Sequence, residues 1–84
     1  MKVDVLFFAI LRDISQSDKI EMELDNEMTI AEFFTQLCET FPKLEKYASI
    51  VSFAINSEYC DRTQMIHDGD EIALIPPISG GNYG

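Results

Sequence analysis

The stretch that decides the fold is TIAEFFTQLCETFP, residues 29–42. It opens with Thr29 and Glu32 at the spacing of a capping box, in which the Thr hydroxyl and the Glu carboxylate bind free backbone amides of the first helical turn. Its apolar residues recur at helical spacing, at Ile30, Phe33, Phe34, Leu37 and Phe41. Pro42 disfavours helical geometry in the residue before it, so we expect one amphipathic helix that ends there.

Strands precede and follow this helix. Residues 3–9 are rich in β-branched and aromatic side chains, and residues 20–24 alternate between apolar and acidic side chains, so we expect the two to form a hairpin. The polar residues 12–19 between them are expected to hold a short helical turn. Further strands are expected at residues 51–55, at residues 71–75 and, as a short edge strand, at Tyr59-Cys60. Asn56-Ser57 and Asp68-Gly69-Asp70 are expected to be tight turns.

The resulting order is ββαββ, which is the order of an α+β protein with a β-grasp fold. We expect a mixed sheet of four to five strands packed on one main helix. A right-handed crossover through the helix places the first and last strands side by side and parallel. The composition of the chain predicts one domain over residues 1–76, followed by an extended tail over residues 77–84.

Side-chain alternation assigns the two faces of the sheet. Acidic Asp4 and Glu71 mark the face that the helix leaves open. The face under the helix then receives Val3, Val5, Phe7, Ile72 and Leu74. The open face receives Leu6, Phe8, Ala73 and Ile75, with Lys19, Glu21 and Glu23 along the second strand. An apolar group on a solvated face usually marks an interface, although a slip of one residue would expose Phe7 and Leu74 instead.

The chain end leads out of the last strand as Ile75-Pro76-Pro77-Ile78-Ser79-Gly80-Gly81, followed by Asn82-Tyr83-Gly84. The two prolines stop the strand, because proline lacks the backbone donor that a sheet ladder requires. The two glycines remove side chains, so that the backbone can enter a narrow channel. The tail is therefore expected to place its end inside a partner protein.

Composition narrows the choice of partner. The 84 residues carry 6 Lys and Arg against 15 Asp and Glu, a formal net charge of -9. This charge disfavours nucleic acid and anionic membranes and favours a basic protein partner. No apolar run reaches the length of a membrane span, and Asp4 interrupts the apolar segment that a secretory signal requires. We expect a cytoplasmic protein.

The cysteines and the single histidine do not indicate a catalytic or metal site. Cys38 and Cys60 stand apart, with no second cysteine or histidine at metal-ligand spacing. Cys38 lies in the helical pattern and is expected to pack as a small apolar residue. His67 lies in the polar turn before the last strand, where we expect it to be solvated.

Three segments together resemble the small subunit of molybdopterin synthase, a family of ubiquitin-like sulfur carriers. They are VLFFAILRD at residues 5–13, DGDEIALI at residues 68–75 and PPISGG at residues 76–81. A Gly-Gly pair alone is a weak signal, whereas a strand followed by Pro-Pro-Ile-Ser-Gly-Gly near a chain end is specific. The match spans nearly the whole domain.

The resemblance implies a sulfur carrier that is not itself catalytic and binds no cofactor or metal. An E1-like enzyme, using ATP and magnesium, adenylates the carboxylate of the last glycine, which then becomes a thiocarboxylate. The tail enters the large synthase subunit and gives its sulfur to cyclic pyranopterin monophosphate, forming molybdopterin.

The resemblance also assigns roles to residues. Gly80 and Gly81 become the sulfur-carrying end, and the segment that threads the partner channel comprises Pro76, Pro77, Ile78 and Ser79. Phe8, Arg12 and Ile75 correspond to docking positions of the family. Leu6 and Ala73 join them in the expected docking patch.

One departure from the family concerns Asn82-Tyr83-Gly84, because mature members end at the second glycine. Removal of these three residues would free the carboxylate of Gly81. Activation at Gly84 is the alternative, in which Tyr83 would have to pass where the family has only glycine. Two other function classes remain open: a related carrier for thiamin synthesis, tRNA thiolation or lysine conjugation, and an interaction domain with an inert tail.

Overall fold

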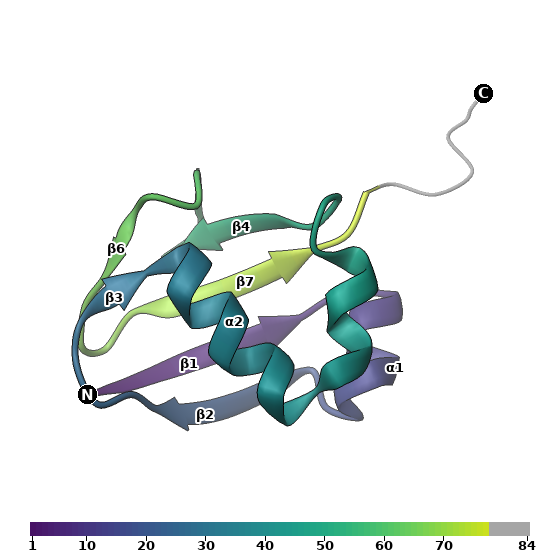
Figure 1. Cartoon of the computed structure of the whole chain (residues 1–84), viewed down its shortest axis with the longest axis horizontal. Helices are drawn as coiled ribbons and strands as arrows, with labels where there is room; N and C mark the ends of the chain where they lie inside the picture. Colours follow the sequence, from purple (N-terminus) through teal and green to yellow (C-terminus); the bar gives the residue numbers. More distant parts are fainter. Residues whose placement is uncertain (78–84) are drawn as a thin grey trace.

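The computed structural model describes residues 1–77, in which one long helix lies across one face of a five-stranded mixed sheet (Figure 1). The strand order across the sheet is β2-β1-β7-β4-β5. These strands span Lys19–Glu23 (β2), Lys2–Phe7 (β1), Glu71–Ile75 (β7), Ser52–Ile55 (β4) and Glu58–Cys60 (β5). The predicted β-grasp fold is confirmed, including Tyr59-Cys60 in an edge strand.

The first and last strands lie side by side and parallel, as predicted. Their register runs from Asp4 opposite Glu71 to Phe7 opposite Leu74. The other three pairs of neighbouring strands in this sheet are antiparallel. Strand β7 therefore has a hydrogen-bonded neighbour on each side, and it delivers the tail from the middle of the sheet (Figure 1).

The long helix is α2, Ile30–Thr40, and its predicted start and end are confirmed. The Glu32 amide donates to the Thr29 hydroxyl at 3.2 Å, and the Thr29 amide donates to a Glu32 carboxylate oxygen at 2.9 Å. After Phe41 a 3-10 helix, η1 (Pro42–Tyr47), follows without a break, which the sequence analysis did not predict. Proline suits the first turn of a helix, so Pro42 ends one helix and begins the next.

The core lies between α2 and the sheet. Val3, Val5 and Phe7 of β1 are buried there, and so are Ile72 and Leu74 of β7, as side-chain alternation predicted. Phe34 of α2 packs edge-to-face on Phe53 of β4, with ring centres 5.5 Å apart. The face assignment of the central strands is therefore correct, and the alternative register slip is wrong.

Three small elements differ from the prediction or were missed. The helical turn expected at residues 12–19 is α1, Ile10–Ser15, which begins earlier. Strands β3 (Met28–Thr29) and β6 (Met65–Ile66) form a separate two-stranded sheet. Two-residue strands carry no periodicity, and their pairing joins segments that lie far apart in the sequence.

Both predicted turns are confirmed by backbone geometry. Asn56 and Ser57 have φ values of 51° and 74° and join β4 to β5 as a two-residue hairpin. Positive φ at both positions is what a type I′ hairpin turn requires. Gly69 has a φ of 86° in the turn before β7, and the absence of a side chain makes that conformation accessible.

Arg62 fastens the connection between η1 and β4 to the core. Its guanidinium donates to the carbonyl oxygens of Ala48 and Val51, the latter at 3.2 Å. It also lies 5.0 Å from the centre of the Phe53 ring. Because guanidinium groups form both charged hydrogen bonds and ring contacts, this one side chain holds residues 48–51 against the domain.

Candidate functional site

The candidate site is the place where the chain leaves β7. The strand ends at Ile75, and Pro76 and Pro77 continue outside the sheet. Figure 1 shows this exit beside the loop that follows η1. The predicted threading residues Ile78 and Ser79 and the predicted sulfur-carrying end, Gly80-Gly81, lie outside the described residues.

The open face of the sheet holds the predicted docking residues, with one correction. Leu6 and Ile75 are half-buried, and Phe8, just beyond β1, is 46% exposed. Ala73 lies on this face as predicted, in register with Leu6, but it is only 9% exposed. Its single methyl group is shorter than the side chain of Leu6, its partner on β1, so Ala73 adds little surface of its own.

The strand register reveals a further residue on this face. Ala73 pairs with Ala54 of β4, and Ala54 pairs with Tyr59 of β5. Paired residues share a face of the sheet, so Leu6, Ala73, Ala54 and Tyr59 form one row across it. Tyr59 is largely exposed. The sequence analysis missed it because its place depends on the β4–β5 register, and the turn at Asn56-Ser57 was the signal that fixes this register.

Arg12 of α1 lies beside the predicted docking residues Leu6 and Phe8. It lines a surface cavity of about 400 Å³ together with Leu6, Phe8, Asp18 and Lys19. Lys19 also forms a 3.6 Å ion pair with Asp4. Two cationic side chains, Arg12 and Lys19, therefore lie near the exposed Phe8 ring, together with the acidic Asp18.

A second apolar surface lies on the helix side of the exit. A cavity of about 230 Å³ is lined by Ala9, Ile10, Tyr47, Ile50, Pro76 and Pro77. No local sequence pattern marks Ile10, Tyr47 and Ile50 as neighbours, because they belong to two connections that only the tertiary fold brings together. We call Ile10, Tyr47 and Ile50 the helix-side cluster.

Both thiols are poorly placed for chemistry. Cys38 and Cys60 are half-buried. Burial, followed by the nearby Glu45 carboxylate, raises the pKa of Cys38 above its ordinary value. Burial, followed by Asp61, raises the pKa of Cys60. Since the thiolate is the reactive form, neither cysteine has the environment of a nucleophile.

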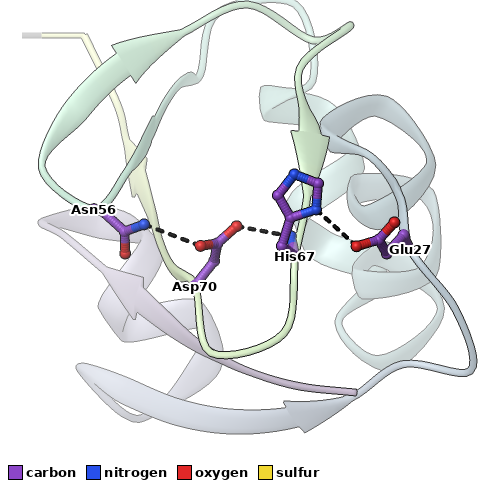
Figure 2. A network of polar contacts seen from close by, with 4 residues as sticks. All are labelled: Glu27, Asn56, His67 and Asp70. Atoms are coloured by element: carbon purple, nitrogen blue, oxygen red, sulfur yellow. Dashed lines mark hydrogen bonds and ion pairs between the residues drawn. The ribbon is translucent and has the colours of Figure 1, made fainter.

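His67 has an exposed ring, but it also has a partner that the sequence analysis did not foresee. Its Nδ1 atom lies 2.8 Å from a carboxylate oxygen of Glu27, as Figure 2 shows. The His67 amide donates to Asp70, and Asp70 accepts from Asn56 at 3.0 Å. These contacts connect the turn before β7 to the β4–β5 hairpin and to the segment before β3. The network positions the start of β7, at the end of the strand away from the tail.

Within residues 1–77, no helix is long and apolar enough to cross a membrane. The same residues contain no group of three or more His, Cys, Asp and Glu side chains arranged to hold a metal ion.

The chain is similar to known proteins over nearly its whole length. Residues 5–81 match the model of the ThiS family. The molybdopterin synthase sulfur carrier subunit of Aedes aegypti is 38% identical and that of Arabidopsis thaliana 33% identical; each match covers 96% of this chain, with 90% and 84% of the relatives.

Solved structures agree with the fold. SAMP1 from Haloferax volcanii has a TM-score of 0.85 and 25% identity, with 96% of this chain and 100% of that chain covered. Subunits 1 and 2 of molybdopterin-converting factor from Helicobacter pylori were solved as a complex. The matching chain there has a TM-score of 0.67 at 24% identity, with 96% of this chain and 100% of that chain covered, a likeness of fold alone.

The strand order, the capped helix and the central position of the last strand define a small ubiquitin-like β-grasp protein. The chain belongs to the ThiS family. The predicted resemblance to the small subunit of molybdopterin synthase is confirmed by relatives of that name.

Proposed function

We propose that this protein is the sulfur carrier subunit of molybdopterin synthase and that Gly81 carries the sulfur as a terminal thiocarboxylate. The observation that carries the proposal is the family match over residues 5–81, whose last residue is the second glycine of PPISGG. The relatives named as sulfur carrier subunits of that enzyme support the same role. Asn82-Tyr83-Gly84 are removed in the active form, because Gly81 has no free carboxylate while they are attached.

The geometry of the exit supports this role. Residues 1–76 act as the folded domain, and residues 77–84 act as the tail, since the sheet ends at Ile75 and Pro76 has no donor for a further ladder bond. Docking uses the open face through Leu6, Phe8 and Ile75, with Arg12 beside them. Ala73 contributes the flat centre of this surface.

The chemistry is divided between two partners. In an E1-like enzyme, the Gly81 carboxylate attacks the α-phosphate of magnesium-bound ATP and releases pyrophosphate. A donor that supplies sulfur at the oxidation level of sulfide then displaces AMP from the acyl carbon, which leaves the thiocarboxylate. In the large synthase subunit, the thiocarboxylate sulfur displaces an oxygen substituent of cyclic pyranopterin monophosphate and forms a thioester with it. Water then cleaves the acyl–sulfur bond, which leaves the sulfur on the pterin and returns Gly81 to its carboxylate. A thiocarboxylate hydrolyses in water, so an enclosed partner channel protects it. Both partners are cytoplasmic proteins in this proposal.

A second candidate function is protein modification through an isopeptide bond. The similarity to SAMP1, whose name stands for small archaeal modifier protein 1, favours this function. The same terminal carboxylate would serve either role. The two functions differ in the acceptor of the activated glycine: a sulfur donor in one case and a lysine amine in the other.

The test compares a chain that ends at Gly81 with the 84-residue chain and with a chain that ends at Gly80. Each is incubated with the activating enzyme, ATP and a sulfur donor, and its intact mass is measured. The chain ending at Gly81 should gain the mass difference between sulfur and oxygen and should then form molybdopterin with the large subunit. The 84-residue chain should bind the large subunit without transferring sulfur.

The opposite results separate the alternatives. Sulfur on the intact 84-residue chain, with full molybdopterin formation, would contradict Gly81 as the carrier. Conjugates to lysine without molybdopterin formation would favour the modifier role. Equal activity of the chain ending at Gly80 would show that the second glycine is dispensable.

A further inference from the structure

The exposed apolar side chains are concentrated around the tail exit. Phe8, Ile10 and Ile50 are three of the five large apolar residues that are exposed within residues 1–77. Phe8 lies beside the open face, whereas Ile10 and Ile50 lie on the helix side, 44% and 50% exposed. Pro76 and Pro77 line the helix-side cavity themselves, so the chain leaves β7 along this surface.

 The backbone conformation of Ala9 explains how its neighbours, Phe8 and Ile10, reach two different surfaces. Ala9 has a φ of 53° and a ψ of -129°, a conformation that residues with a side chain rarely adopt. It turns the chain sharply between Phe8 and Ile10. Strained backbone persists where the surrounding structure imposes it, and such residues cluster at functional sites.

The other wall of the cavity is fixed before any partner binds. The amides of Ile50 and Val51 both donate to the carbonyl oxygen of Tyr47, at 3.0 Å and 2.9 Å. Arg62 binds the carbonyl oxygens on either side of Ile50, at Ala48 and Val51. These hydrogen bonds order the loop that exposes Ile50 to solvent. Because the loop is already ordered, a partner that contacts Ile50 costs it little conformational entropy on binding.

The reach of the tail limits how far a partner can stand from this surface. Gly81 is only four positions beyond Pro77 in the sequence, and four extended residues span about 14 Å at most. A partner that encloses Gly81 in a reaction channel must therefore place the mouth of that channel close to Pro77. Since Pro77 lines the helix-side cavity, the mouth cannot close around the tail without approaching Ile10 and Ile50.

We propose that the large synthase subunit binds on both sides of the tail, with the rim of its channel packed on the helix-side cluster as well as on the open face. This inference rests on the proposed function and adds Ile10, Tyr47 and Ile50 to the interface. The rim is apolar where it meets Ile10 and Ile50. A second copy of this chain is a poorer occupant, because each copy carries a formal net charge of -9 and the copies repel.

The test measures the affinity of the large subunit for the chain ending at Gly81 and for two variants, Ile50→Glu and Ile10→Ser. Gln36→Glu is the matched control, because it adds the same charge as Ile50→Glu at an exposed position of α2. Thermal unfolding of each variant verifies the fold. We expect each helix-side variant to raise Kd by about tenfold or more and the control to change Kd by less than about twofold.

Two failures are distinguishable. If the unaltered chain binds the large subunit and transfers sulfur, but both folded helix-side variants bind equally well, the helix-side interface is wrong and the proposed function stands. If the unaltered chain neither binds the large subunit nor acquires sulfur, the proposed function and this inference are both overturned. Self-association of the unaltered chain that Ile50→Glu abolishes, with no effect on Kd for the large subunit, would assign the surface to a second copy and overturn the proposal.

Discussion

Leu6 of β1 and Tyr59 of β5 stand in one row across the open face, with Ala73 and Ala54 between them. The row begins on β1, next to the central strand β7, and ends on the edge strand β5. Tyr59 is the more exposed of the two. A partner seated on this face therefore meets an aliphatic side chain over the central strands and an aromatic one at the margin.

Phe8→Ala should weaken docking without unfolding the domain. Phe8 is half solvent-exposed before binding, so we expect the free energy of unfolding to fall by less than about 1 kcal/mol. A central aromatic contact typically contributes about 1 to 4 kcal/mol to binding, and the large subunit should lose affinity by that amount. Titration calorimetry gives the affinity and urea denaturation the stability. Tyr59→Ala should have a smaller effect on Kd, and unfolding of the Phe8 variant with unchanged affinity would place Phe8 in the core.

Ala9→Gly should leave the fold as stable as before or stabilise it by up to about 1 kcal/mol. Glycine adopts positive φ readily, so the substitution relieves strain, which opposes the greater entropy of glycine in the unfolded chain. Ala9→Val is the matched variant, because a β-branched side chain tolerates this conformation least. Urea denaturation should rank the chains with Val least stable. A clear loss of stability for glycine would show that the Ala9 conformation carries no strain.

Arg62→Ala should destabilise the domain by about 2 to 3 kcal/mol. The substitution leaves the carbonyl oxygens of Ala48 and Val51 without their donor and removes a cation from the ring of Phe53. Arg62→Lys keeps the charge but lacks the forked donor group, and it should give an intermediate value. Equal stability of all three chains in urea would mean that water replaces the guanidinium at no cost.

Alkylation of the two thiols should be slower in the folded chain than in the unfolded chain. Burial raises the pKa of Cys38 and of Cys60, so at a pH near the ordinary thiol value of about 8.5 the folded chain holds less thiolate. Because the folded-state pKa values are raised, the folded chain holds the thiol protons more tightly than the unfolded chain. The resulting contribution to the free energy of unfolding is fully present below the unfolded-state pKa and is lost as the pH rises through the folded-state pKa. Iodoacetamide labelling followed by mass spectrometry, with and without urea, measures both rates, and Cys38→Ser isolates Cys60. Faster labelling of the folded chain would contradict the direction of these shifts.

The parts of the fold that were predicted correctly are those that neighbouring residues specify. Thr29 and Glu32 determine the start of α2, and the alternation around Asp4 and Glu71 determines which side chains enter the core. These signals act within a few residues, so they can be read from the chain alone. The β1–β7 pairing followed from the handedness of the crossover.

The parts that were missed depend on contacts between distant segments. Met28 pairs with Ile66, and Glu27 meets His67, although neither pair is marked by periodicity. Ile10 and Ile50 line one cavity only because the fold brings two connections together at the tail exit. The small exposure of Ala73 depends on the size of its neighbours, which alternation does not report.

The position of β7 has a mechanical consequence for the proposed function, in which the tail enters a partner and is withdrawn. A pull on the tail acts along β7, because the strand continues directly into Pro76. The hydrogen bonds to β1 and to β4 run across that direction, so the load shears both ladders together instead of opening one bond after another. Bonds loaded in parallel share the force, and the domain can therefore be drawn off a partner by its tail while its sheet stays intact.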